Sequence, residues 1–207
     1  MNSVLVNISR RLKIELPKGQ SAFLWGPRKT GKTTYLDHHF PESTRFDLLE
    51  TDTFFRFTKE PYLLRQEIQS LRDNHRLRQP VIIDEVQKIP PLLDEIHWMI
   101  EKWKISFILC GSSARKLKRS HANLLGGRAW RFELFPLTTD ELGKNFDLLQ
   151  AMNRGLLPSH YLDPNCQRTI KAYIHDYLKE EIKEEGLTRN LPAFARFLDA
   201  VPFSCGE

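Results

Sequence analysis

The sequence predicts an α/β fold with three layers, in which helices cover both faces of a parallel β-sheet. Two observations support this prediction. Short apolar runs alternate with segments of helical periodicity between residues 22 and 135, and Gly or Pro residues stand at many of the junctions. Parallel strands need crossover connections, which the intervening helices would provide. After residue 138 the pattern becomes helical throughout, which predicts a C-terminal helical extension.

Five short apolar runs are the candidate strands of the sheet. In chain order they are residues 22–25, 44–48, 81–83, 105–110 and 130–135. A helix is expected from Lys32 onward, and two more over 61–74 and 91–103, where apolar residues recur on one face.

The helical extension is predicted to contain three helices. Apolar residues recur at helical spacing over 139–149 and 167–185, and Asn190 with Pro192 supplies the start signal of a last helix. The predicted organisation is therefore an α/β domain over residues 1–138 and a helical extension over residues 139–207.

Composition excludes several classes of protein. With 41% hydrophobic and 28% charged residues, the 207-residue chain has the usual balance of a folded domain. No stretch approaches the roughly 18 apolar residues that span a bilayer, so we predict a cytoplasmic protein without a membrane partner. The three cysteines form no metal-binding spacing, and two are expected to be buried.

Residues 26–33 form the string Gly-Pro-Arg-Lys-Thr-Gly-Lys-Thr, which matches the phosphate-loop pattern G-x-x-x-x-G-K-[ST]. It follows a predicted strand and opens a predicted helix, the context that a P-loop requires. Glycines let such a loop wrap tightly, so that backbone N–H groups and the helix amino terminus face phosphate oxygens. The predicted nucleotide-binding residues are Gly26, Pro27, Arg28, Lys29, Thr30, Gly31, Lys32, Thr33 and Thr34.

Within this P-loop, Lys32 is expected to reach the β- and γ-phosphates. The Thr33 hydroxyl would hold Mg²⁺, and Thr34 would support the α-phosphate. Arg28 and Lys29 add positive charge at the lip of the loop, where they either contact phosphate or remain solvated surface residues.

The apolar run 81–83 ends in two adjacent acids, Asp84 and Glu85. Asp84 is expected to bind Mg²⁺, in part through water, and Glu85 to orient or deprotonate the attacking water, because this strand end lies where the γ-phosphate is presented. An apolar run followed by two acids is common by chance. Its occurrence downstream of a P-loop makes the assignment specific.

Two further groups are candidate catalytic residues. Ser112 and Ser113 follow the strand 105–110, and one hydroxyl would sense the γ-phosphate, unless both simply cap a short helix. Arg128, or Arg131 instead, would neutralise charge in the transition state, from the same chain or from a neighbouring subunit; the alternative is a surface charge. The basic segment 111–128 contains no acid, which leaves nucleic-acid binding open.

Five stretches together resemble a bacterial and archaeal group of AAA+ class ATPases. They are GPRKTGKTT at 26–34, VIIDEVQKIP at 81–90, GSSARKLKR at 111–119, NLLGGRA at 123–129 and FPLT at 135–138. All five in this order are much more specific than a P-loop alone. The tail 177–201 is similar to the helical region after the ATPase core of that group, so the resemblance covers nearly the whole chain.

The resemblance implies an AAA-like P-loop NTPase with ATP as its nucleotide. It also implies a sheet in which the strand that ends at Gly111 lies between the P-loop strand and the Asp84 strand. Members of the group usually continue into a winged-helix-like segment and a C-terminal domain of unknown function, and this sequence ends before either. Carried over by position, the roles are phosphate and metal binding for Lys32 and Thr33, metal and water binding for Asp84 and Glu85, sensing for Ser112 or Ser113, and an arginine finger for Arg128.

The sequence therefore predicts an ATPase that hydrolyses ATP to ADP and phosphate with Mg²⁺ and couples the nucleotide state to conformational change or assembly. The alternative is a nucleotide-dependent module that binds a protein or DNA and hydrolyses little ATP. The Asp84-Glu85 pair and the lack of an obvious acceptor pocket argue against a kinase. A GTPase is disfavoured because the chain has no Asn-Lys-x-Asp string. A protein partner, a nucleic-acid partner and an oligomer all remain open.

Overall fold

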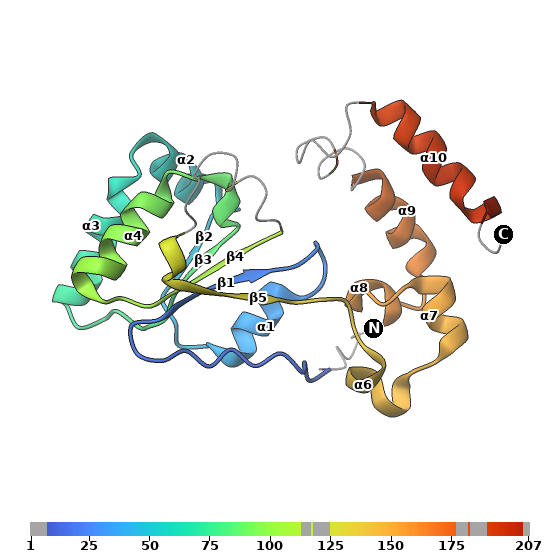
Figure 1. Cartoon of the computed structure of the whole chain (residues 1–207), viewed down its shortest axis with the longest axis horizontal. Coiled ribbons are helices and arrows are strands. Elements are labelled where there is room, and N and C mark those ends of the chain that lie inside the picture. Colours follow the sequence, from blue (N-terminus) through green and yellow to red (C-terminus); the bar gives the residue numbers. More distant parts are fainter. Residues whose placement is uncertain (1–7, 113–116, 118–124, 177–181, 183–189, 205–207) are drawn as a thin grey trace. The chain divides into compact units, whose positions relative to one another are not determined.

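The structure is a computed structural model that describes residues 8–112, 117, 125–176, 182 and 190–204 (Figure 1). The chain forms two compact units, Met1–Phe146 and Asp147–Glu207. The first is an α/β unit, and the described part of the second is helical. The predicted boundary at residue 138 falls inside the first unit, which continues through one more short helix.

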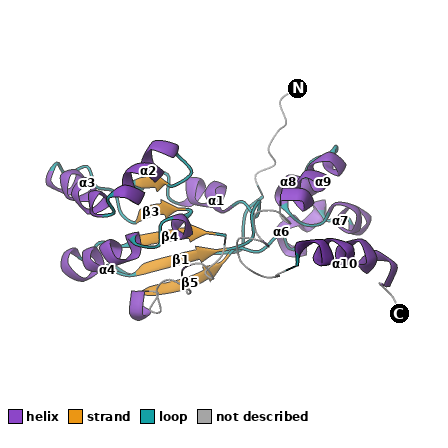
Figure 2. Ribbon diagram, turned by 90° about the horizontal axis from the view of Figure 1, so that it is seen from above, coloured by secondary structure: helices purple, strands orange, loops and turns teal. Residues whose placement is uncertain are grey.

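A five-stranded sheet with the order β2-β3-β4-β1-β5 forms the centre of the first unit. All of its strand pairs are parallel, and Figure 2 shows β3, β4, β1 and β5 side by side. The predicted α/β fold is confirmed, and so is the position of β4 between the P-loop strand and the Asp84 strand. The strands are β1 (Ser21–Trp25), β2 (Arg45–Asp47), β3 (Val81–Asp84), β4 (Phe107–Gly111) and β5 (Ala129–Glu133).

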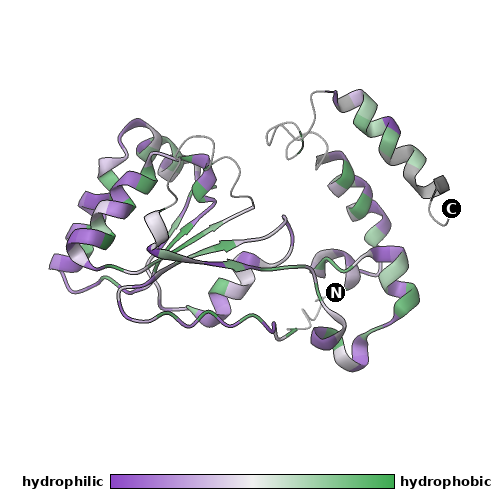
Figure 3. Ribbon diagram, viewed as in Figure 1, coloured by the Kyte–Doolittle hydropathy of each residue, from purple (hydrophilic) through white to green (hydrophobic). Residues whose placement is uncertain are grey.

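Helices cover both faces of this sheet. Helix α1 (Lys32–His39) lies on one face, and α2 (Thr51–Lys59), α3 (Tyr62–Asp73) and α4 (Leu92–Trp103) lie on the other (Figure 1). Because successive strand residues point to opposite faces, Leu24 of β1 joins the core under α1, whereas Phe23 and Trp25 join the core under α2 to α4. Strands buried on both faces read as continuous apolar runs, and they carry the hydrophobic colours in Figure 3.

Helix α2 has no counterpart among the predicted helices. Its residues are rich in Thr and Phe, which have modest helix propensity, so the local pattern is weak. Thr53 and Phe57 are four residues apart and both buried, and Phe57 packs edge to face on Phe46 of β2 with ring centroids 5.8 Å apart. Tertiary packing therefore stabilises a helix that local propensity does not favour.

The helix predicted over 139–149 is wrong as a single element. The chain forms α6 (Thr139–Leu142), the 3-10 turn η3 (Gly143–Asn145) and α7 (Leu148–Arg154) instead. Gly143 adopts a positive φ of 50° at the end of α6, and the Asp147 carboxylate accepts a 2.8 Å hydrogen bond from the Gln150 amide to begin α7.

Three further helices follow α7 among the described residues of the second unit. They are α8 (Pro158–Tyr161), α9 (Cys166–Asp176) and α10 (Leu191–Ser204). Helix α9 confirms the first part of the helix predicted over 167–185. The rest of that prediction, apart from residue 182, lies outside the described residues. The Asn190 carboxamide accepts a 2.9 Å bond from the Ala193 amide, which confirms the predicted start of the last helix.

The fold buries two cysteine thiols, Cys110 and Cys166, as the sequence predicted for two of the three cysteines. Among the helices that the structure describes, none has the length and hydropathy needed to cross a bilayer.

Candidate functional site

The predicted P-loop connects the carboxyl end of β1 to the amino end of α1. Lys29 and Gly31 adopt positive φ angles of 65° and 89°, which turn the chain sharply into the helix. The Tyr35 amide donates to the Gly31 carbonyl at 2.8 Å, so the N–H groups of the first turn precede the helical hydrogen-bond ladder. The first turn contains no acidic residue. The loop therefore presents backbone N–H groups and the positive end of the helix dipole, which together attract anions.

Gly26 begins the loop in close contact with the chain that leaves β5. The Leu134 amide donates to the Trp25 carbonyl at 2.7 Å. A β-carbon added at Gly26 would lie 2.2 Å from the Leu134 carbonyl oxygen, a backbone atom that cannot swing aside. Glycine is required here because two backbone segments meet without room for a side chain.

We expect Gly26→Ala to destabilise the first unit by about 3 kcal/mol, the upper part of the usual range for overpacking. Urea unfolding of the full chain measures this loss. Gly19→Ala is the matched control, because an added β-carbon there meets nothing within 4 Å and only its positive φ of 79° is unfavourable, at about 1 kcal/mol. Equal losses in the two variants would contradict the close contact at Gly26.

Lys32 is the first residue of α1, and its side chain turns back over the loop. It is 7% exposed, and Nζ donates to the Gly26 carbonyl at 2.7 Å and to the Pro27 carbonyl at 3.0 Å. Thr30 is fully buried, and its hydroxyl also donates to the Pro27 carbonyl, at 2.9 Å. The ammonium is thus held at the loop by two neutral carbonyl oxygens. Its hydrogen bond to an anionic oxygen would be stronger than either of these.

Thr33 and Asp84 bring the two predicted motifs together. The Thr33 hydroxyl donates to Asp84 Oδ2 at 3.0 Å, across a sequence separation of 51 residues. Asp84 is the last residue of β3 and only 4% exposed, and its Oδ1 accepts the Glu85 amide at 3.0 Å. The carboxyl ends of parallel strands meet at one edge of the sheet, which places these residues beside the P-loop.

Cys110 lies on β4, next to the strand that carries Asp84. Burial raises the pKa of the Cys110 thiol well above its ordinary value, and the nearby Asp84 carboxylate raises it further. The thiol therefore stays protonated and behaves as a small apolar group in the wall of the site.

Glu85 is linked to the end of β4 through a residue that the motifs did not single out. Glu85 adopts a left-handed conformation with φ 56°, and its carboxylate accepts a hydrogen bond from Gln87 Nε2. The same nitrogen donates to Ser112 Oγ at 3.3 Å. The structure therefore brings Ser112 to Glu85, and Ser113 lies outside the described residues.

The remaining predicted residues of the loop differ in exposure. Arg28 is half-buried, whereas Pro27, Lys29 and Thr34 are exposed. Thr33 is also exposed, so the loop is open on the side where Thr33 meets Asp84.

Arg128 does not reach the loop within this chain. Strands β1 and β5 run parallel and in register, so Arg128, which precedes β5, lies at the amino end of the sheet beside Ser21. The P-loop follows Trp25, at the other end of β1. Four residues of strand separate Ser21 from Trp25, which at about 3.3 Å per residue is a distance of about 13 Å. The Arg128 guanidinium instead pairs with Glu101 of α4, and this hydrogen bond and charge lower the pKa of Glu101. Arg131 is exposed and pairs with Glu133 of its own strand at 2.5 Å.

Arg10, which no sequence motif marked, contacts the P-loop from outside it. Its Nη1 donates to the Thr30 carbonyl at 2.7 Å, and its Nη2 to the Phe135 carbonyl at 2.5 Å. Its Nε pairs with Glu141 at 3.0 Å, and the two side chains are 10% and 4% exposed. Arg10 therefore ties together the P-loop, the segment after β5 and helix α6.

Glu141 also belongs to a capping box that begins α6. Its amide donates to the Thr138 hydroxyl at 3.2 Å, and its carboxylate accepts the Thr138 amide at 3.0 Å. Burial by itself raises the pKa of Glu141, but hydrogen bonds from Arg11, Arg10 and Thr138 outweigh it, so the pKa is lowered. Of this arrangement only the capping box was readable in advance, from Thr-x-x-Glu.

We expect Glu141→Gln to destabilise the first unit by about 2 kcal/mol at pH 7, because a charged acceptor of several hydrogen bonds is lost. The folded pKa lies below the ordinary value of 4.5, so this stabilisation is complete above that value and is lost as pH falls through the folded pKa. Urea unfolding at pH 7 and at pH 3 measures the difference. Glu133→Gln, whose partner is exposed, is the control and should change stability by no more than about 0.5 kcal/mol. A Glu141→Gln defect of equal size at both pH values would contradict the charge-based explanation.

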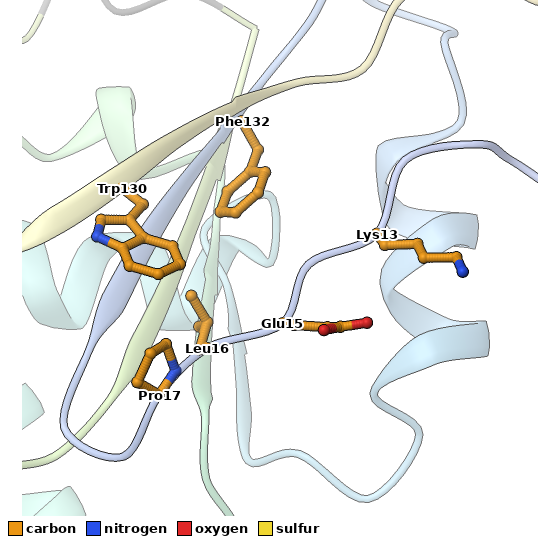
Figure 4. A pocket seen from close by; sticks show the side chains of 6 residues that line it. All are labelled: Lys13, Glu15, Leu16, Pro17, Trp130 and Phe132. Carbon is orange, nitrogen blue, oxygen red and sulfur yellow. The ribbon is translucent and has the colours of Figure 1, made fainter.

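A separate open pocket of about 680 Å³ lies at the edge strand β5. Figure 4 shows the rings of Trp130 and Phe132 near Leu16 and Pro17, with the ends of Lys13 and Glu15 pointing away from them. Its walls are mainly apolar, and its two charges have opposite sign. The two charged residues that line this pocket therefore offer an anion no net positive charge.

Comparison with known proteins identifies one matching family model. It is described as an AAA domain and matches residues 18–143, more than half of the chain. None of the curated proteins matches the sequence. A solved structure of the Aeropyrum pernix ORC2 protein, in ADPNP and ADP complexes, aligns with 14% identity and a TM-score of 0.39, over 60% of this chain and 44% of that chain. That alignment is too loose to support an argument about function.

Proposed function

The chain belongs to the AAA domain family, and we propose that it binds ATP at its P-loop and hydrolyses it to ADP and phosphate with Mg²⁺. The nucleotide state would be coupled to a change in conformation or assembly. The single observation that carries the proposal is the 3.0 Å hydrogen bond between Thr33 and Asp84, because it brings the phosphate-binding motif and the acid pair into one site.

Lys32 supports triphosphate binding. Its ammonium now bonds two backbone carbonyls, at 2.7 and 3.0 Å, and anionic phosphate oxygens at the same loop would be stronger acceptors. We propose that the triphosphate takes over the ammonium while the amides of the first turn of α1 cradle its other oxygens. Arg28 and Lys29 would add positive charge at the rim.

The oxygens of Thr33 and Asp84 fit a magnesium ion. The two oxygens lie 3.0 Å apart, and hydroxyl and carboxylate oxygens are ligands that Mg²⁺ prefers. Thr33 would bind the metal directly and Asp84 partly through water. When bound with the nucleotide, Mg²⁺ neutralises charge on the β- and γ-phosphates.

The Glu85 carboxylate is the proposed general base, which orients and deprotonates the attacking water. It directly follows the metal residue Asp84, so it would face the γ-phosphate side of the site. Ser112 is the proposed sensor hydroxyl, since it already shares a donor with Glu85. Arg128 lies at the far end of the sheet from the P-loop of its own chain. It therefore stays a proposed arginine finger only for the nucleotide site of a neighbouring copy.

The experiment that tests the proposal measures ATP binding and phosphate release by the purified chain, with Mg²⁺ and with Mg²⁺ chelated. We expect binding in the micromolar range or tighter, and turnover that requires the metal. Absence of ATP binding would overturn the proposal.

A second outcome of the same experiment would favour the alternative function. Tight ATP binding with negligible turnover would indicate a nucleotide-dependent module whose target is a protein or DNA. Repeating the turnover measurement with DNA separates the two partner classes. The mass of the assembly with ATP bound shows whether the chain forms an oligomer. DNA-stimulated turnover would favour nucleic acid, whereas an unchanged rate would favour a protein partner.

A further inference from the structure

Gln87 is a buried polar side chain beside Glu85 to which the proposed reaction gives no task. It lies in the 3-10 turn η1 (Val86–Lys88) that follows β3, and it is 7% exposed. Its Nε2 donates to Glu85 Oε2 and, at 3.3 Å, to Ser112 Oγ. One amide therefore joins the acid after β3 to the hydroxyl after the neighbouring strand β4.

The Glu85 carboxylate determines which way the Gln87 amide faces. A carboxylate accepts hydrogen bonds and an amide nitrogen donates them, so the nitrogen faces Glu85 and the oxygen faces away. The Gln87 Oε1 atom then lies against the backbone of Gly111, where an added β-carbon would be 2.1 Å from it. Glycine at the end of β4 is what allows the amide to sit between the two strand ends.

The position of Gln87 Oε1 has a cost in stability. The atom is buried, and no donor among the described residues bonds it. A buried acceptor without a donor is unfavourable, so an apolar side chain of similar volume would be at least as stable at this position. Packing alone therefore does not account for a glutamine here, whereas a task for its NH₂ group does.

From this geometry we infer that Gln87 is a positioning residue for Glu85. Its NH₂ group holds one carboxylate oxygen of Glu85, which leaves the other oxygen to take the proton of the water that attacks the γ-phosphate. Its second hydrogen bond makes that orientation depend on Ser112 at the end of β4. The inference rests on the proposed function, since Glu85 has this task only if ATP is hydrolysed here.

The test replaces Gln87 by Met, which keeps the volume and removes the amide. We expect kcat for ATP hydrolysis to fall about 10- to 100-fold, the usual effect of a misplaced catalytic group. The affinity for ATP should stay within about threefold, and the thermal midpoint should be unchanged or higher, because the unsatisfied acceptor is gone. In the double variant with Glu85→Gln, kcat should be no lower than in Glu85→Gln alone, because both changes act on the same step.

Three results would overturn the inference. They are an unchanged or raised kcat in Gln87→Met, a parallel loss of thermal midpoint and ATP affinity, and additive effects in the double variant. If Gln87→Met does not fold, Gln87→Asn is measured instead, and the same fall in kcat at unchanged affinity is required of it. If neither variant folds, Gln87 is a structural residue and the inference is wrong.

The proposed function can fail independently of this inference. A wild-type chain without turnover, or a Glu85→Gln variant that retains turnover, would remove the proposed function itself. Loss of turnover in Glu85→Gln with normal turnover in Gln87→Met would remove only the inference.

Discussion

We expect replacement of Glu85 by Gln to lower ATP turnover by about 10²- to 10⁴-fold, the range for loss of a general base, while the affinity for ATP stays within about threefold. The amide has the shape of the carboxylate but cannot take a proton from water. Asp84, Thr33 and the P-loop are untouched, so the triphosphate should still bind. Phosphate release at saturating ATP, together with equilibrium binding, measures the two quantities separately.

The control for this substitution is Glu67→Gln on α3. The Glu67 carboxylate is 39% exposed and pairs with Arg56 across the surface of two helices, away from the P-loop. Its loss should leave turnover unchanged. Full turnover in Glu85→Gln would show that Glu85 is not the general base, even if ATP binding is normal.

We expect replacement of Lys32 by Ala to weaken the binding of ATP with Mg²⁺ by about 100-fold or more. Lys32 is 7% exposed and its ammonium bonds the loop, so its hydrogen bonds to phosphate oxygens would form in a site with little competing water. Two charge-assisted bonds of about 1.5 kcal/mol each correspond to roughly that loss of affinity. Isothermal titration or a fluorescent ATP analogue measures the dissociation constant.

Lys59→Ala is the matched control, because Lys59 is exposed at the end of α2. Circular dichroism of both variants checks folding, since Lys32→Ala also removes the donor to the Gly26 and Pro27 carbonyls. Undiminished affinity in a folded Lys32→Ala protein would contradict the P-loop assignment. Glu85→Gln and Lys32→Ala therefore separate chemistry from binding.

Local sequence patterns predicted the parts of the site that depend on short segments. The P-loop is a strand, a turn and a helix start within about a dozen residues, so spacing alone identified it. The acids Asp84 and Glu85 were readable for the same reason, because they directly follow a buried strand. The resemblance implied that the strand with Gly111 lies between the P-loop strand and the Asp84 strand, and the pairing of β4 with both β1 and β3 confirms this position.

Other parts of the molecule could not be read from the chain alone. Helix α2 has weak local propensity and is held by packing of Phe57, and the segment 139–149 breaks at Gly143 because a positive φ ends α6 there. Arg128 belongs to the stretch NLLGGRA that carries the resemblance, yet the parallel register of β5 places it at the far end of the sheet from the P-loop.

The sequence by itself determined the phosphate-binding loop, the acid pair and the parallel α/β sheet, because each is encoded by residues that are neighbours along the chain. Only the tertiary structure decided that Thr33 meets Asp84, that Gln87 joins Glu85 to Ser112 and that Arg10 holds the loop to α6. These contacts depend on strand register and on close approach at glycines such as Gly111. Register and packing are set by the whole core, so no local pattern contains them.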